Sequence, residues 1–249
     1  HAFKPMTELF TFPPRFFVVN PTLDNFRGLM KASQTSGIPM SRYVFNSLVV
    51  TLSDVLLSIV LSTTAGFALS KLKFRGKEAL MEINNMALMF VPVAVMIPRY
   101  LVIDTLNITN NYLAHILPLL AMPVSLFLVK QFIDQIPDAL IDAAYMDGAT
   151  DFVVYRRIIM PMIRPAIATA AILSFQQVWA NVESSNLYMS EDGLRTLAFY
   201  MNTLANANNT VAGQGIAAAA TLIMFVPNLV MFIICQKNVM NTMAHSGIK

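Results

Sequence analysis

Charged side chains are scarce in this sequence of 249 residues. Asp, Glu, Lys and Arg make up 12% of it, whereas about 25% is usual for a soluble domain. Hydrophobic residues make up 56%. This balance excludes an ordinary soluble domain and indicates a membrane protein. The net charge of +3 is too small to indicate a surface that binds nucleic acid.

Cysteine is almost absent, and so are the motifs of catalysis. Cys235 is the single cysteine, which excludes an internal disulfide framework, and its apolar surroundings favour a packing role. No glycine-rich phosphate loop of the Walker type is present, so no ATP site is assigned to the chain. We therefore expect no enzyme and no cofactor or metal bound by this chain.

Long runs with little charge take up most of the sequence. A helix needs roughly 20 mostly apolar residues to cross a bilayer, and five runs are about that long. They are residues 43–70, 83–103, 111–129, 165–182 and 215–236. We therefore expect an all-α membrane protein with five spans. Prolines within the spans are tolerated, because neighbouring helices can satisfy the carbonyls that proline leaves free. They predict kinks in these helices.

The Lys and Arg residues that join the spans fall mainly on one side of the membrane. Ten lie in the connections after the first and third spans and in the tail, against only Arg99 and Arg195 on the other side. The positive-inside rule makes the side with ten cytoplasmic. Residues 1–43 then form an extracytoplasmic or interfacial segment. Because this segment leads into the first span from outside, we expect one further span before residue 1.

A polar segment, residues 134–164, interrupts the apolar runs on the cytoplasmic side. Pro137 suits the first turn of a helix and Asp138 suits its positive end, so a helix should begin there. Gly148 supplies a C-terminal stop. This helix should have one apolar face and another that is acidic. The apolar residues are Ile136, Leu140, Ile141, Ala144 and Tyr145, and the acidic ones are Asp134, Asp138 and Asp142.

A second short helix is predicted after the glycine. Thr150 is a suitable N-cap, and the helix should cover residues 151–160 until Pro161 ends it. Two interpretations remain open for the pair: the helices lie flat among lipid headgroups, or a protein partner docks on them. The acidic residues favour the partner, because anionic lipid would repel them.

The spacing from Asp142 to Pro161, in the sequence DAAYMDGATDFVVYRRIIMP, carries a resemblance. It resembles the cytoplasmic loop signature of ATP-binding-cassette (ABC) importer permeases: Glu-Ala-Ala, three residues, Gly, nine residues, Ile, one residue, Leu-Pro. Every spacing matches, with Asp142 in place of Glu and Met160 in place of Leu. The Asn-Ser start and Phe-Arg-Gly turn of the first span, and the ending GIK, are similar to the carbohydrate-uptake, maltose-type branch. The resemblance covers residues 44–249.

The resemblance implies the transmembrane-domain fold of a type I ABC importer and a multi-pass location in the bacterial cytoplasmic (inner) membrane. The implied function is that of a permease subunit in a binding-protein-dependent importer of a sugar, in particular an oligosaccharide, which works by alternating access. The implied partners are a second, homologous permease subunit, two ATPase subunits that bind ATP and Mg, an extracytoplasmic solute-binding protein, the sugar and membrane lipid, but no nucleic acid.

The alternative function is a proton- or ion-coupled secondary transporter. That class expects an internal repeat and ionisable groups near the membrane midplane. No repeat is evident here, and only Asp54 and His115 are candidates for such groups.

The resemblance also assigns candidate residues to the 134–164 segment, which it implies is a coupling loop that docks in the ATPase. The implied docking residues are Asp142, Ala143, Ala144, Gly148, Ile158 and Pro161, with Tyr145, Arg156 and Arg157 as further contacts. The small alanine side chains permit close approach of another surface, and Gly148 permits a sharp turn. For the two arginines, a role in orienting the chain by the positive-inside rule stays equally open.

Polar residues in and after the spans are the other candidates. Because such residues are costly in a membrane, we expect a substrate path at some of them, with bundle stabilisation or an aromatic belt as the alternative. These residues are Gln176, Gln177, Trp179, Asn181 and Asp54. The external connection, residues 183–214, is either a solvated loop or, by the resemblance, a probe of the binding protein. The candidates for that contact are Met201, Asn202, Asn206, Asn208 and Asn209, within residues 201–212.

Overall fold

The computed structural model describes residues 1–13, 16–34, 37–207 and 213–246. Over these residues all regular elements are helices, which confirms the predicted all-α class. The chain divides into two compact units. The first unit comprises residues 1–51, 103–115 and 178–230, and the second comprises residues 52–102, 116–177 and those from 231 onward.

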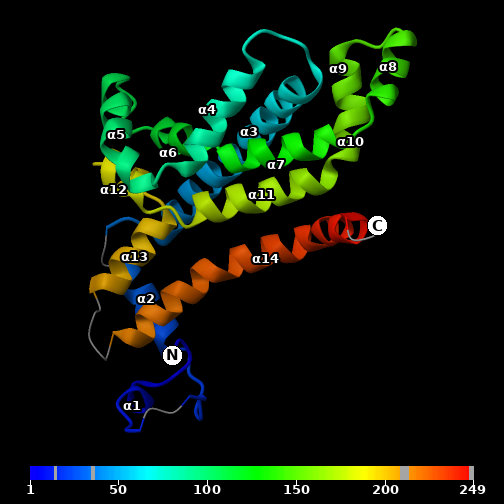
Figure 1. The fold of residues 1–249 in the computed structure, drawn as a ribbon. Coiled ribbons are helices and arrows are strands. Elements are labelled where there is room, and N and C mark those ends of the chain that lie inside the picture. Colours follow the sequence, from blue (N-terminus) through cyan, green and yellow to red (C-terminus); the bar gives the residue numbers. More distant parts are fainter. Residues whose placement is uncertain (14–15, 35–36, 208–212, 247–249) are drawn as a thin grey trace. The chain divides into compact units, whose positions relative to one another are not determined.

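Figure 1 shows the helices coloured along the chain. In order they are α1 Met6–Leu9, α2 Asp24–Gln34, α3 Met40–Lys71, α4 Lys77–Met89, η1 Pro92–Val95, α5 Met96–Thr105, α6 Tyr112–Leu120, α7 Pro123–Asp134, α8 Asp138–Met146, α9 Asp151–Val154, η2 Tyr155–Ile159, α10 Met160–Met162, α11 Arg164–Trp179, α12 Glu183–Tyr188, η3 Asp192–Leu194, α13 Leu197–Ala207 and α14 Gln214–Ser246. Of these, η2 is a π-helix, and η1 and η3 are 3₁₀-helices.

Within the described residues, two helices are long and apolar enough to cross a membrane alone: α3 and the Gln214–Gln236 part of α14. Three bent pairs of helices pass the same test together, so the chain has up to five spans if each pair counts as one. The bends are 110° between Lys77–Met89 and Pro92–Thr105, 47° between α6 and α7, and 79° between Asp151–Met162 and α11. The number agrees with the predicted five, and the 110° bend before Pro92 agrees with the kink predicted for residues 83–103.

Prolines mark two of these bends. Pro92 opens η1 and Pro123 opens α7, each at a place where the helix before it has ended, because proline cannot donate a backbone hydrogen bond. At the second bend, the Asn84 side-chain amide donates to the Pro123 carbonyl over 3.2 Å, which satisfies part of the freed backbone. In contrast, α6 and α14 run through Pro118 and Pro227 without interruption.

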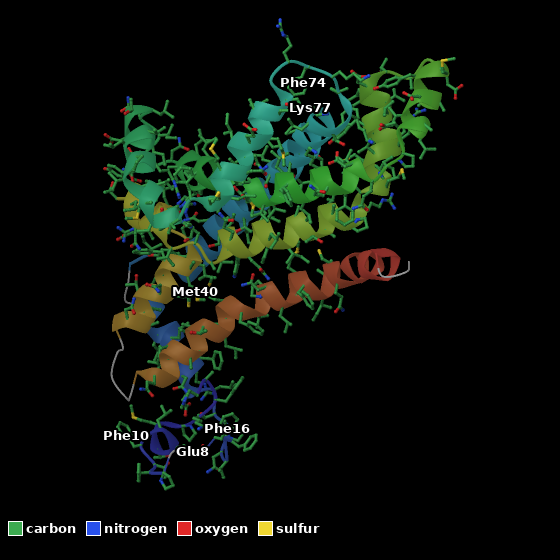
Figure 2. The ribbon with its side chains drawn as sticks, viewed as in Figure 1. Glu8, Phe10, Phe16, Met40, Phe74 and Lys77 are labelled. Atoms are coloured by element: carbon green, nitrogen blue, oxygen red, sulfur yellow. The ribbon has the colours of Figure 1, made fainter. Side chains whose placement is uncertain are left out.

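Among the described residues of the segment before α3, no helix reaches spanning length, as predicted. Its helices α1 and α2 have 4 and 11 residues. Figure 2 labels Phe10 and Phe16 in this segment, Met40 at the start of α3 and Lys77 at the start of α4. Because α3 already begins at Met40, the segment ends before the predicted boundary at residue 43.

The core of the second unit holds the polar segment in place. Buried apolar residues of α3, α7, α8 and the helices up to α11 form one cluster there. Its members include Phe67, Val129, Ile133, Ile141, Val154, Ile159 and Ile163. Gly66 allows α3 to approach α7 closely, since a Cβ on it would lie 3.0 Å from a methyl carbon of Val129. The polar segment, residues 134–164, is therefore anchored to the apolar core of the second unit.

Candidate functional site: a helical hairpin at residues 134–164

The first half of the hairpin is α8, which begins at Asp138 after Pro137 and ends at the Gly148 turn, as predicted. Gly148 has φ of 80°, a left-handed conformation that favours glycine. The N–H of Ala149 donates to the Ala144 carbonyl over 2.9 Å, and that of Gly148 to the Tyr145 carbonyl over 3.0 Å. These two bonds form a Schellman motif, which satisfies carbonyls at the helix end.

The second half differs from the prediction at its end. Thr150 holds the N-cap position of α9 as predicted, but without a side-chain capping bond. Pro161 does not end the helix: the chain passes from α9 through the π-helix η2 into α10. Pro161 lies in the first turn of α10, where its missing N–H is tolerated. The turn to α11 comes at Ile163 instead.

A hydrogen bond closes the hairpin across its turn. The Tyr145 hydroxyl donates to Asp151 Oδ1 over 2.8 Å. Loss of solvent, and after it this bond to Asp151, raise the pKa of Tyr145. The Tyr145 side chain therefore links α8 to α9. Its contact with an ATPase stays a prediction, and because the hydroxyl is already bonded, that contact would be made by the ring.

The motif residues divide between the surface and the core. On the surface lie Asp142, Ala143, Gly148, Arg156, Arg157 and Pro161. Ala144 and Ile158 are half-buried and pack against the apolar cluster. A Cβ on Gly148 would meet no atom within 4 Å, so glycine is required by backbone conformation and not by crowding inside the chain. The residues that face outward are those to which a partner surface has access.

Sequence reasoning missed an apolar surface on the same hairpin. Met146 is 89% exposed and Phe152 is 65% exposed, one on each side of the Gly148 turn. Leu140 and Tyr145, which belong to the predicted apolar face of α8, are exposed as well. The signal was present in the sequence, because two apolar residues flank the turn off the helical period of Ile141 and Ala144. Exposed large apolar side chains beside a polar rim are typical of a docking surface.

The predicted acidic face is partly neutralised by lysines. Lys130 Nζ lies 2.6 Å from Asp134 Oδ2, and Lys71 Nζ lies 2.6 Å from Asp138 Oδ1. The bond from Lys71 and its positive charge lower the pKa of Asp138. Asp142 remains as an exposed carboxylate in the motif, so the repulsion of anionic lipid is weaker than the sequence predicts.

The residues expected along a substrate path are distributed over both units. Gln176 and Gln177 are exposed near the end of α11. Trp179 is buried, and its indole N–H donates to the Met224 carbonyl over 3.1 Å. The Asn181 side chain accepts from the N–H of Ser184 over 2.9 Å. For Trp179 and Asn181 these bonds favour the stabilising alternative, while a role in the path stays a prediction.

Asp54 is fully buried in the second unit. Ser174 Oγ donates to Asp54 Oδ2 over 3.1 Å, and Oδ1 has no hydrogen-bond partner among the described residues. One turn further along α3, Ser58 and Ser62 line a cavity of about 200 Å³ with Asn84, at the break between α6 and α7. Sequence reasoning named Asp54 but missed Ser58 and Ser62, although the three residues follow one another at helical spacing.

The external connection is folded, so its interpretation as a solvated loop is wrong for residues 183–207. Helices α12, η3 and α13 occupy most of it. Asn46 of α3 donates to the carbonyls of Gly193 and Arg195 over 2.9 and 2.8 Å, and Ser47 accepts from the N–H of Leu197 over 2.8 Å. These bonds fix the connection to the start of α3.

The residues predicted to contact a binding protein differ in how far they are exposed. Met201 is 2% exposed, so its side chain is not on the free surface of the unit. Asn202 and Asn206 are exposed and bonded to each other over 2.9 Å. Asn208 and Asn209 lie outside the described residues. Asn202 and Asn206 therefore stay available as predicted contacts.

Comparison with known proteins agrees with this fold. Residues 58–237 match the family model described as "Binding-protein-dependent transport system inner membrane component". The sulfoquinovosyl glycerol transport system permease protein SmoH of Agrobacterium fabrum is 28% identical over 100% of this chain and 85% of its own length. The maltose/maltodextrin transport system permease protein MalG of Vibrio parahaemolyticus is 27% identical over 92% of this chain and 82% of its own.

A solved structure shares the fold. The chain superposes with a TM-score of 0.80 and 17% identity on the crystal structure of a bacterial ABC transporter involved in the import of the acidic polysaccharide alginate, over 95% of this chain and 86% of that one. This likeness confirms the predicted fold of an ABC importer transmembrane domain. The chain belongs to the family of binding-protein-dependent transport system inner membrane components.

Proposed function

We propose that this chain is a permease subunit that carries a sugar, in particular an oligosaccharide, across the inner membrane by alternating access. A partner ATPase, which binds ATP and Mg, drives the change of state. The complex contains a second, homologous permease subunit, two ATPase subunits and an extracytoplasmic binding protein. The chain itself holds no nucleotide site in this proposal.

The observation that carries the proposal is the hairpin around Gly148. Asp142 presents an exposed carboxylate, Ala143 beside it is small enough to permit close approach, and Met146 and Phe152 present apolar side chains. Together with the Schellman turn, they make a rigid, two-sided surface suited to a cleft in another protein. The related permease proteins of the sulfoquinovosyl glycerol and maltose/maltodextrin transport systems support a sugar as the substrate.

Reconstitution tests this proposal. The permease pair is co-expressed with its ATPase subunits, purified and placed in liposomes with the binding protein. ATP hydrolysis and uptake are then measured with three probes: maltodextrin, sulfoquinovosyl glycerol and an alginate oligosaccharide. We expect uptake of at least one probe that depends on ATP and on the binding protein. Uptake that needs no ATP but follows a proton or sodium gradient would contradict the proposal and support the secondary transporter.

A further inference from the structure

The hairpin is attached to α3 at two points, one before its turn and one after. Before the turn, Lys71 Nζ donates to the Ile136 carbonyl and to Asp138 Oδ1, each over 2.6 Å. After the turn, the hydroxyls of Tyr155 and Thr63 lie 2.8 Å apart. Thr63 and Lys71 are separated by about 12 Å along the helix axis, at 1.5 Å per residue.

In the attachment before the turn, the residue contributed by α3 is well buried. Only 7% of the Lys71 side chain is exposed, although its partner Asp138 is 80% exposed. The neighbouring Ser70 hydroxyl donates to Asp134 Oδ1 over 2.5 Å. The last turn of α3 therefore holds the chain both at the end of α7 and at the start of α8, through two carboxylate acceptors and one backbone carbonyl.

The attachment after the turn has a defined direction. Thr63 is fully buried, and its hydroxyl bonds the Ile59 carbonyl over 2.7 Å. A carbonyl only accepts, so the single Thr63 proton goes to Ile59, and the Tyr155 hydroxyl donates to Thr63. The Tyr155 ring also lies 5.8 Å from the ring of Phe67, on the same helix. Tyr155 is thus held by both its ring and its hydroxyl.

Tyr155 is also the first residue of the π-helix η2. Single π-turns within α-helices are found frequently at functional sites, since they shift the side chains that follow. Here the π-helix lies in the second half of the hairpin, where that half meets α3. It follows the exposed Phe152 and ends at the buried Ile159. A single attachment would allow the hairpin to pivot on α3, whereas two attachments on one rigid helix prevent that rotation.

We propose that Tyr155 and Lys71 are positioning residues that make α3 move with the hairpin as one body. The inference rests on the proposed function, in which an ATPase moves the hairpin. A displacement that starts at Met146 or Phe152 then reaches α3, and with it Asp54, Ser58 and Ser62 of its buried polar side. Without the Tyr155–Thr63 bond, the same displacement would be absorbed between the hairpin and α3.

Distances between two spin labels test the proposal. With Cys235 replaced by serine, the labels are placed at Leu57→Cys on α3 and Thr150→Cys at the hairpin turn, two exposed positions of the second unit that are not among the docking residues. The distance is measured in the complete complex with ATPase subunits, before and after trapping Mg-ATP with vanadate. The variants are Tyr155→Phe and Thr63→Val. Thr63→Ser keeps the hydroxyl, and Thr64→Val removes an exposed hydroxyl that bonds only its own helix.

In the parent protein, Thr63→Ser and Thr64→Val we expect the distance to stay unchanged on trapping. In Tyr155→Phe and Thr63→Val we expect it to shift by about 2 to 5 Å, the range of helix displacements in switching proteins. Combining the two substitutions should add nothing further, because both remove the same bond. Equal folded yields and equal retention of trapped nucleotide show that the variants still fold and dock.

Two outcomes would overturn the inference. The first is a shift in the parent protein as large as in Tyr155→Phe, and the second is an unchanged distance in both Tyr155→Phe and Thr63→Val. Failure of the proposed function would give a different result: no ATPase would co-purify with the parent protein, and no nucleotide would be trapped.

Discussion

The hairpin at residues 134–164 and the connection at residues 183–207 are both polar segments between apolar helices, yet they are held by different bonds. The hairpin turn depends on local bonds, such as Ala149 to Ala144 and Tyr145 to Asp151. The connection depends on α3 and α6. His115 of α6, for example, contacts the Ser184 hydroxyl at 2.7 Å and the Leu194 carbonyl at 3.1 Å.

The difference decides what each segment can offer a partner. Local bonds leave the outer side of the hairpin free, so Asp142, Met146 and Phe152 remain exposed. In the connection, the hydroxyls of Ser184, Ser185 and Thr196 form hydrogen bonds inside the unit. We infer that the hairpin is shaped for docking, and that the connection is mainly a brace that holds the start of α3.

The strongest way to break the hairpin is Gly148→Pro. Proline fixes φ near −65°, about 145° from the left-handed φ of 80° at this position. It also removes the N–H that bonds Tyr145. We expect a cost of about 3 kcal/mol to the hairpin conformation, hence roughly a hundredfold weaker ATPase binding, measured by titration of the ATPase in detergent. The chain should still insert in the membrane.

Gly76→Pro is the matched control, because Gly76 has φ of 88° and equally open space but lies before α4, outside the hairpin. We expect its ATPase affinity to stay within about threefold of the parent value. Equal losses in both variants would show that the hairpin conformation is not what the ATPase recognises.

The strongest way to break the connection is Asn46→Ala. The Asn46 side chain donates to two carbonyls and accepts from the Tyr112 hydroxyl over 2.7 Å. The Gly193 carbonyl keeps a second donor, Arg42 Nε at 3.1 Å, so mainly Arg195 and Tyr112 lose a partner. We expect the free energy of unfolding in detergent to fall by about 2 kcal/mol. ATPase affinity, by contrast, should not change.

Asn202→Ala is the control for this loss, since Asn202 is exposed in α13 and its side chain accepts one hydrogen bond, from the exposed Asn206. Its effect on unfolding should be within about 0.5 kcal/mol. If Asn46→Ala behaved like Asn202→Ala, the connection would not depend on α3 for its stability.

The same contrast explains what the sequence could predict. Pro137, Gly148 and Thr150 encode the hairpin in neighbouring residues, so its helices and its turn were predictable. Nothing near Gly193 indicates that Asn46, 147 residues earlier, will bind its carbonyl. The burial of Met201 and the folding of the connection therefore escaped prediction. The extension of the second hairpin helix through Pro161 escaped for another reason, because a π-turn has no simple sequence signal.

Tyr145→Phe should weaken the hairpin without removing its turn. It deletes the hydroxyl that bonds Asp151 and keeps the ring. Because the site is partly exposed, we expect a loss of about 0.5 to 1 kcal/mol, seen as faster amide hydrogen exchange over residues 144–151. Asp151→Asn keeps an oxygen acceptor and should have a smaller effect. Faster exchange in α13 as well would contradict a local role for this bond.

The smallest effect should come from protonation of Asp138. Lys71 lowers the pKa of this carboxyl below its ordinary value of 3.8. A lowered pKa means that the ionised form is favoured in the folded chain, so its contribution is present above the ordinary pKa and lost as pH falls through the lowered one. The bond between Lys71 and Asp138 should thus be insensitive to pH near neutrality.

Thermal unfolding in detergent between about pH 3 and pH 7 checks this sign. We expect Asp138→Asn to lower the midpoint slightly at neutral pH, and the difference from the parent protein to vanish towards the acid end. Asp142→Asn, one turn along the same helix and exposed, is the matched control for the loss of a carboxylate from α8. Because Asp138 is largely in solvent, salt should reduce its effect too. No midpoint difference for Asp138→Asn at any pH would mean that Lys71 is held by the Ile136 carbonyl alone. A difference that grows in acid would contradict the lowered pKa of Asp138.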